Sequence, residues 1–221
     1  MKIGVFNIEH GDAFSDWGKV STIGEHEYYL CSLNADKQTK NKNFVDHPSF
    51  CEMRAQYWVW KNCLELYDYF SFSGYRKKLF IYPLSNIVKY DIIVPHPINF
   101  SKSVGEQYKQ WHRAEDWEVF FTCPAIVPKY FHCNSLLPAN TYVLSKQEFD
   151  NYMQWWEKFA YEISSSIEPP KDPYQSRVYA FLSERAFTFY YLSQSELKTL
   201  AVPLLVYQNA IPIDIRDCVN E

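Results

Sequence analysis

The sequence predicts one α/β domain in which helices flank a mainly parallel central sheet. Short apolar segments of strand length alternate along the chain with longer segments that begin at helix-capping residues. A length of 221 residues suits one domain of ordinary size. A hydrophobic fraction of 47% and a charged fraction of 22% are typical of globular proteins, so a disordered chain and a coiled coil are excluded. We therefore expect residues 1–221 to form a single domain.

The predicted strands are short runs of branched and aromatic residues that end at turn or charged residues. The first covers residues 2–8 and ends at the polar turn around Gly11. Three more strands are predicted over residues 69–73, 90–94 and 141–144. Ligands of α/β proteins bind at the carboxyl ends of parallel strands, so we expect the functional site at that edge of the sheet.

Capping sequences predict where the helices begin. In a Ser-x-x-Glu sequence the two side chains can satisfy backbone N–H groups that the first helical turn leaves free. Such sequences occur at Ser49/Glu52, Ser103/Glu106, Ser145/Glu148 and Ser193/Glu196. Asp172 followed by Pro173 predicts a fifth helix start. The first helix, over residues 49–66, is apolar on nearly all sides, so we expect it to be buried.

Composition excludes several classes of function. The glycines stand at positions 4, 11, 18, 24, 74 and 105, too far apart for a phosphate-binding loop or a dinucleotide-binding fingerprint. A net charge of −4 gives no basic field, so no nucleic-acid partner is expected. The sequence contains neither a run of about 18 apolar residues nor a signal peptide, which predicts a soluble intracellular protein.

Cysteine and histidine spacing predicts neither disulfides nor a metal site. None of the six cysteines forms a Cys-x-x-Cys pair, so we expect reduced thiols, most of them in the core. The six histidines include no His-x-x-x-His pair. We therefore expect no structural metal.

A basic turn follows the second predicted strand. Arg76 and Lys77 lie just past the strand end, where α/β enzymes bind phosphate-bearing ligands, and an arginine can bind a diphosphate through parallel hydrogen bonds. A solvated charge cluster is the alternative. Lys61, near the end of the first helix, either faces the same anion or complements the helix dipole.

Six segments carry a resemblance to a known family. They are CEMRAQYWVWKN (51–62), DYFSFSGYRKKLF (68–80), YDIIVP (90–95), QYKQWHRAEDW (107–117), NTYVLSKQEFDNYMQWW (140–156) and SRVYAFLSERAF (176–187). In this order they resemble the motifs of the DUF4422 family, and the resemblance extends over residues 2–207. The family comprises bacterial glycosyltransferases of capsule, lipooligosaccharide and O-antigen synthesis, some of them assigned as galactofuranosyltransferases. The family turn usually reads His-Tyr-Arg-Arg, whereas this chain has Gly74 in place of the histidine and Lys77 in place of the second arginine.

The resemblance implies a compact GT-A-like fold and a nucleotide-sugar donor, which we expect to be UDP-linked. Metal-dependent GT-A enzymes place Asp-x-Asp at the end of a central strand, whereas this chain places cations there. We predict that these cations stabilise the departing nucleoside diphosphate, so that no cofactor is required, with Mn²⁺ or Mg²⁺ as the alternative. The predicted donor-binding residues are His10, Tyr75, Arg76, Lys77, Lys61, Arg177 and Arg185.

An inverting sugar transfer needs a carboxylate that takes the proton of the acceptor hydroxyl. Glu184 is the first candidate because it shares a helix face with Arg177 and Phe181, although it can instead pair with a basic residue of another element. Asp116 is the second candidate, because His112 stands four residues earlier and can hydrogen-bond it if the segment is helical. A satisfied surface pair is the alternative for these two residues.

Three residues are predicted to contact the acceptor sugar: His112, Trp58 and Asn140. Trp58, like Tyr75 and Trp111, can stack on uracil or on the apolar face of a sugar ring. Aromatic residues make up 19% of the chain, and most of them must nevertheless lie in the core. Asn140 either hydrogen-bonds a sugar hydroxyl or forms a turn.

These features predict a glycosyltransferase that transfers a hexose, with galactofuranose among the candidates, to a growing bacterial surface polysaccharide. The expected acceptor is a lipid-linked acceptor or an oligosaccharide. The expected location is the cytoplasm, with peripheral association with the inner membrane as the alternative. One alternative is a non-catalytic glycan- or nucleotide-binding module in which Gly74 has lost the chemistry of the turn. A sugar phosphotransferase has less support, because neither a nucleotide-phosphate loop nor a metal-binding acidic pair is evident.

Overall fold

The computed structural model describes residues 1–9, 17–37, 43–74, 76–81, 83–126 and 128–206. The main sheet contains β1 Lys2–Glu9, β2 Trp17–Ile23, β3 His26–Asn34, β4 Tyr69–Gly74, β5 Lys77–Leu79, β6 Ile92–Pro95, β9 Tyr142–Ser145, β10 Thr199–Val202 and β11 Leu204–Val206. A separate two-stranded sheet joins β7 Ile98–Asn99 to β8 Ser135–Leu136. The α-helices are α1 Glu52–Cys63, α2 Val104–Trp111, α3 Ala114–Thr122, α4 Lys146–Ser166 and α5 Val178–Ser193.

The strand order of the main sheet is β10-β6-β9-β4-β1-β3-β2, and the hairpin strand β5 joins β4 to β11. β1 lies parallel between β3 and β4, and β10 lies parallel to β6. β9 is antiparallel to both β4 and β6, so β6 and β10 point in the same direction as β1, β3 and β4. Only β9 and the edge strand β2 oppose this direction along the described path. The predicted α/β fold with a mainly parallel sheet is confirmed.

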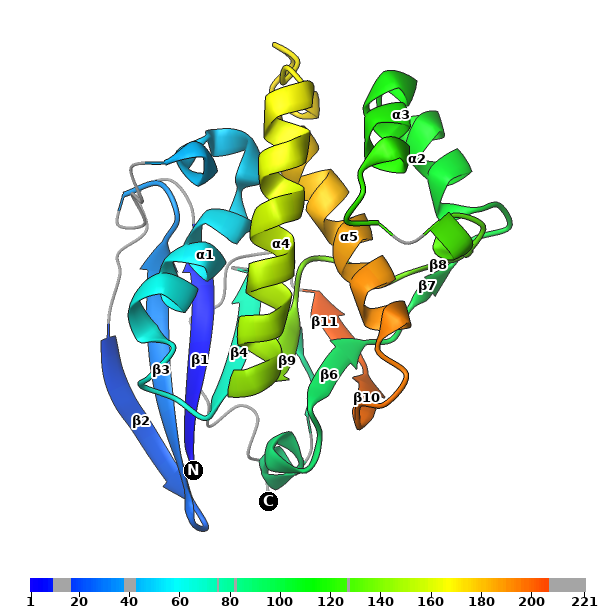
Figure 1. Ribbon diagram of the computed structural model, residues 1–221. Helices are drawn as coiled ribbons and strands as arrows, with labels where there is room; N and C mark the ends of the chain where they lie inside the picture. The colour runs from blue at the N-terminus through cyan, green and yellow to red at the C-terminus, as the bar shows by residue number, and fades with distance from the viewer. Residues whose placement is uncertain (10–16, 38–42, 75, 82, 127, 207–221) are drawn as a thin grey trace.

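Helices α1, α4 and α5 cover one face of the sheet, while α2 and α3 stand at the upper right of the picture (Figure 1). The main core fills the space between the sheet and these helices, with Phe70, Phe149 and Trp156 fully buried. A smaller apolar cluster that includes Ile3 and Ile93 lies on the other face of the sheet. Because side chains alternate between the two faces of a strand, β1 contributes to both clusters.

The four predicted strands are confirmed as β1, β4, β6 and β9. Two of the predicted capped helices are also confirmed: Ser103 and Glu106 form a complete capping box on α2, and the Ser145 side chain accepts from the Glu148 backbone N–H at the start of α4. Asp172 Oδ1 accepts from the backbone N–H groups of two following residues, and this capped turn leads through a 3-10 helix into α5.

Two predicted helix starts are wrong. The N-cap of α1 is Cys51, whose side chain makes no capping bond, because the chain first forms a 3-10 turn over Pro48–Phe50 that takes up Ser49. Ser193 ends α5 instead of starting a helix, and its hydroxyl donates to the Tyr190 carbonyl at 2.6 Å. The short segment that follows leads directly into β10.

The cysteines in the described part of the chain are free thiols: Cys31, Cys51, Cys63 and Cys123 are buried, and Cys133 is half-buried. This confirms the expectation of reduced thiols for these five, and Cys218 lies outside the described residues. Among the helices described, none has both the length and the apolar character needed to cross a bilayer.

Candidate functional site

A cavity of about 330 Å³ opens beside the carboxyl end of the central strand β4. β4 ends at Gly74, which pairs with Lys77 of β5, and the Lys77 side chain lines the cavity. The other walls come from the start of α1, the end of α2, the segment that leads into β9, and α5 with the turn before it. The cavity therefore lies at the edge of the sheet where ligands of α/β proteins bind.

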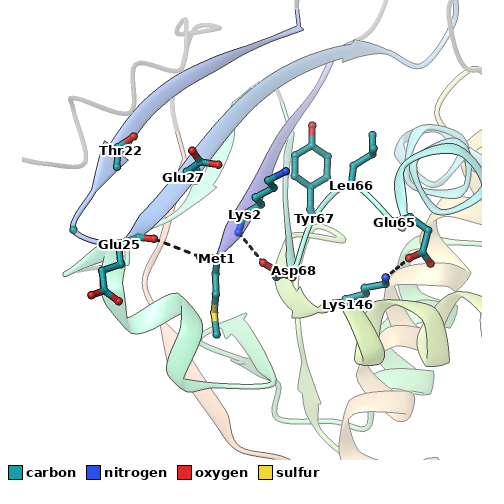
Figure 2. Close-up of a pocket in the computed structure, with 11 residues that line it drawn as sticks. Met1, Lys2, Thr22, Glu25, Glu27, Glu65, Leu66, Tyr67, Asp68 and Lys146 are labelled. Carbon is teal, nitrogen blue, oxygen red and sulfur yellow. Dashed lines mark hydrogen bonds and ion pairs between the residues drawn. The ribbon is translucent and has the colours of Figure 1, made fainter.

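A larger cavity, of about 590 Å³, lies at the opposite edge of the sheet (Figure 2). It is lined where β1, β3 and β4 begin, by residues such as Lys2, Glu27 and Asp68. The Lys2 backbone N–H donates to Asp68 at 2.8 Å, and Lys146 forms an ion pair with Glu65 across the rim (Figure 2). Because this edge carries the amino-terminal ends of the parallel strands, and Asp68, Glu65 and Lys146 already have partners, we assign the candidate site to the smaller cavity.

Two cations of the smaller cavity are available to a ligand. Lys77 is exposed and forms no ion pair with any described residue. The Arg177 guanidinium is partly exposed, packs over the Phe181 ring at 5.5 Å, and has its nearest carboxylate, Glu52, at 3.9 Å. Arg177 Nε also donates to the Cys51 sulfur at 3.4 Å. An exposed lysine and an incompletely paired arginine form a suitable surface for a phosphate-bearing ligand.

Arg185 is a buried cation with partners inside the protein. Only 3% of the residue is exposed, and its guanidinium donates to Glu184 at 2.8 Å and to Gln107 of α2 at 3.1 Å. It also packs over the Tyr108 ring at 5.2 Å, while its Nε has no partner. Arg185 thus ties α2 to α5 beneath the cavity.

The segment that leads into β9 is strained where it lines the cavity. Ala139 has a φ of 78° and Asn140 a φ of 46°, the left-handed region, which alanine rarely adopts and asparagine adopts more often. Glu184 accepts from the Ala139 backbone N–H, and Gln56 of α1 donates to the Asn140 carbonyl at 2.9 Å. Strain of this kind persists only where the surroundings enforce it, and it concentrates at functional sites. The Asn140 side-chain oxygen is buried without a protein partner, so a ligand hydroxyl can supply the missing hydrogen bond.

The protonation of His112, at the end of α2, follows from its neighbour. Gln175 Nε2 donates to the Trp111 carbonyl at 2.9 Å, which directs Gln175 Oε1 toward His112 Nδ1 at 3.0 Å. Nδ1 therefore carries the proton of the neutral ring, and Nε2 is left as an acceptor. Burial lowers the pKa of His112, which favours this neutral form at pH 7.

The cavity brings together many of the predicted site residues. Those that line it are Lys77, His112, Asn140, Arg177, Glu184 and Arg185. Arg76 precedes Lys77 at the surface without lining the cavity, and His10 and Tyr75 lie outside the described residues. Lys61 forms an ion pair with Glu157 at 3.1 Å and lies over the Trp60 ring, and Trp58 packs against the main core, so α1 places both away from the cavity.

Asp116 also lies outside the cavity, and it does not share a helix with His112. α2 ends at Trp111 and α3 begins at Ala114, so the condition for a bonded pair four residues apart is not met. Arg113 instead donates to both Asp116 oxygens, at 3.0 and 2.5 Å. Burial raises the pKa of this carboxyl, and the bonds from Arg113 oppose the rise. The pair holds the turn between α2 and α3.

The sequence does not predict three of the residues that line the cavity. The Ser49/Glu52 pattern predicts a capping role for Glu52, but Glu52 lines the cavity and accepts no hydrogen bond within the described part of the chain. Tyr174 and Gln107 also line the cavity, and no local pattern distinguished them. No group of three His, Cys, Asp or Glu side chains among the described residues is arranged to hold a metal ion, and metal independence stays a prediction.

Comparison with known proteins identifies the family. The family model described as "Domain of unknown function (DUF4422)" matches residues 26–195. The chain belongs to this family. The comparison with curated proteins gives no match.

A solved structure shares the fold of this DUF4422 chain. The apo structure of WbbM, described as a bifunctional glycosyltransferase, matches with a TM-score of 0.71 and 18% sequence identity. The match covers 93% of this chain and 46% of that chain, so this chain spans about half of the WbbM length. The predicted fold is thus shared with part of a glycosyltransferase.

Proposed function

We propose that this DUF4422 chain is a glycosyltransferase domain that binds a nucleotide-sugar donor, expected to be UDP-linked, at the carboxyl edge of the sheet. The observation that carries this proposal is one cavity, at the end of β4, that holds the cations Lys77 and Arg177 together with the carboxylates Glu52 and Glu184. Cations can stabilise a diphosphate leaving group, and a carboxylate can accept the proton of an attacking hydroxyl. The fold shared with part of a glycosyltransferase supports this assignment.

In this proposal the acceptor hydroxyl oxygen attacks the anomeric carbon of the donor sugar. The new carbon–oxygen bond forms as the bond from that carbon to the diphosphate breaks, with inversion at the anomeric carbon. The hydroxyl proton passes to a carboxylate, and the nucleoside diphosphate leaves with the bonding electron pair. Lys77, Arg177 and the neighbouring Arg76 stabilise the charge that develops on the diphosphate, the role a metal ion has in other glycosyltransferases.

Two carboxylates compete for the role of base, and we favour Glu52. Both Glu184 oxygens are engaged, one by the Ala139 backbone N–H and the other by Arg185. Glu52 has only the distant Arg177 guanidinium, at 3.9 Å, so its oxygens are available to an acceptor hydroxyl. Glu184, the base predicted from the sequence, then holds the strained segment in place.

The donor sugar and the acceptor are proposed by family resemblance. We propose a hexosyl donor, with galactofuranose among the candidates, and a growing bacterial surface polysaccharide as the acceptor. A lipid-linked acceptor would bring the protein to the cytoplasmic face of the inner membrane.

Nucleotide binding tests the proposal. UDP in EDTA should raise the Tm, because a ligand bound only by the folded state stabilises it, by about 2.7 kcal/mol at a hundredfold excess over Kd. For a domain of this size that is about 5–10 °C. Lys77→Met and Arg177→Met should each reduce the rise, whereas Lys102→Met, which removes an exposed lysine outside the cavity, should not. An unchanged Tm with UDP, GDP, CMP and dTDP, in EDTA and in Mn²⁺, would contradict the proposal.

A non-catalytic binding module is the second candidate, and it depends on position 74. A Cβ added at Gly74 meets no atom within 4 Å, so the backbone at this position leaves room for the first atom of a side chain such as the histidine usual in the family. If the turn has degenerated, Gly74→His should gain donor hydrolysis from an inactive wild type. Donor hydrolysis by the wild type itself, with no gain in the variant, would exclude degeneration.

A further inference from the structure

Two large aromatic side chains at the cavity remain exposed to water. Trp111, the last residue of α2, is 63% exposed, and Tyr174, in the turn before α5, is 56% exposed. Both line the cavity that holds the candidate base. Single exposed aromatic rings are common on protein surfaces and need no explanation. Two exposed rings that line the same polar cavity indicate instead a contact with a ligand. We call these two residues the aromatic lip.

Neighbouring side chains hold the backbone of both lip residues and the ring of Tyr174. Gln175 donates to the Trp111 carbonyl and accepts from His112, so one side chain ties the end of α2 to the turn that carries Tyr174. The Tyr174 ring stacks on the His112 ring, with centroids 5.9 Å apart and planes 16° apart, and contacts Phe181 at 5.1 Å. Asp172 fixes the Tyr174 backbone through a 3.0 Å hydrogen bond. The Tyr174 ring, fixed in this way, loses little entropy when a ligand binds, and the backbone of Trp111 is held at the end of α2.

Hydrogen-bonding groups accompany the rings. His112 Nε2 is an acceptor in the neutral ring, and the Asn140 side-chain oxygen has no protein partner although the residue is 7% exposed. Gln107 adds an amide on the α2 side of the cavity. A pyranose ring matches this combination, because it presents an apolar C–H face and an edge of hydroxyl groups.

The lip and the expected position of the donor nucleoside belong to different elements of the fold. In an open α/β sheet ligands bind where the strand order reverses, which here is at β1, with β3 on one side and β4 on the other. The lip is instead carried by the end of α2 and the turn before α5, and α2 stands on the opposite side of the molecule from β3 (Figure 1). We therefore expect the donor nucleoside to lie toward β1, and the lip to lie on the α2 side of the cavity, beside Arg177, which packs over the Phe181 ring that Tyr174 contacts.

We propose that Trp111 and Tyr174 form an acceptor subsite that stacks on the apolar face of a pyranose ring, while His112 and Asn140 meet its hydroxyl groups. This assignment deepens the proposed function and rests on it, because the bound sugar is an acceptor only if the protein transfers a sugar. The binding of a sugar ring to the aromatic lip can be tested without any enzymatic turnover.

Saturation-transfer NMR on the full chain tests the subsite, with methyl pyranosides of galactose, glucose and mannose at millimolar concentration as probes. We expect transfer to the ring C–H protons of one face of at least one pyranoside. Trp111→Ala and Tyr174→Ala should each weaken its binding about tenfold, because each removes one stacking face. Tyr161→Ala is the matched control: Tyr161 is 61% exposed on α4 and lies outside this cavity. It should leave the signal unchanged.

The UDP-dependent rise in Tm, measured on the same variants, separates the two proposals. A rise of wild-type size in Trp111→Ala and Tyr174→Ala, with the sugar signal lost, supports the subsite. If the wild type does not respond to nucleotides but the lip variants lose its sugar signal, the result still supports the sugar subsite and contradicts only the proposed function. The subsite is overturned if the lip variants lose the UDP response, if they keep the sugar signal, or if the wild type binds none of the pyranosides.

Discussion

Glu52→Gln should lower kcat by about 10²–10⁴-fold, the usual contribution of a general base, while the UDP-dependent rise in Tm stays at its wild-type size. Glutamine has the shape of glutamate but accepts no proton, so chemistry is lost and binding is kept. Arg177 lies 3.9 Å away, so the substitution breaks no close ion pair. The measurement is the rate of UDP release from a UDP-sugar with an acceptor, or of donor hydrolysis if no acceptor is at hand.

Glu184→Gln and Glu118→Gln are the matched comparisons for Glu52→Gln. Glu184→Gln should lower the Tm as well as the rate, because its new amide N–H₂ meets Arg185 or the Ala139 backbone N–H, both of which are donors. Glu118 is an exposed carboxylate of α3 outside the cavity, and its replacement should change neither quantity. Full turnover in Glu52→Gln with loss in Glu184→Gln would return the role of base to Glu184, as the sequence predicted.

The strands that the sequence predicted and those that it missed differ in a physical way. β1, β4, β6 and β9 lie inside the sheet, and their segments are short and rich in branched and aromatic residues. β3 lies next to the edge strand β2 and is half-buried, and its segment HEYYLCSLN mixes polar and apolar residues without strict alternation. β10 and β11 are short segments on either side of Pro203, so neither gives a clear period.

The predicted site residues follow the same logic. Arg177, Phe181 and Glu184 share a helix face by spacing alone, and all three line the cavity. Glu52 was missed because a capping pattern explained it, whereas the turn before α1 occupies Ser49. The pairing of His112 with Asp116 required a helix through both residues, and no sequence pattern predicts the break between α2 and α3. A cavity built from distant segments is not encoded by any one of them.

Gln56→Leu should lower the free energy of unfolding by about 2–4 kcal/mol, because it leaves two buried polar groups without partners. Gln56 is fully buried; its amide donates to the Asn140 carbonyl at 2.9 Å and accepts from the Tyr142 hydroxyl. Leucine has a similar size, so lost hydrogen bonds and not an empty volume would cause the change. Urea denaturation measures it, and Gln147→Leu, on the exposed surface of α4, is the control that should stay within about 0.5 kcal/mol of the wild type.

The same variant should also weaken pyranoside binding in saturation-transfer experiments on the protein that remains folded. Gln56 holds the Asn140 carbonyl, and once this bond is lost we expect the segment with positive φ at Ala139 and Asn140 to relax toward the common regions. The side-chain oxygen of Asn140 would then leave the position in which it meets a ligand hydroxyl. A Gln56→Leu protein that is destabilised but binds pyranosides as the wild type does would contradict this prediction. The conformation of residues 139–140 would then contribute to stability and not to sugar recognition.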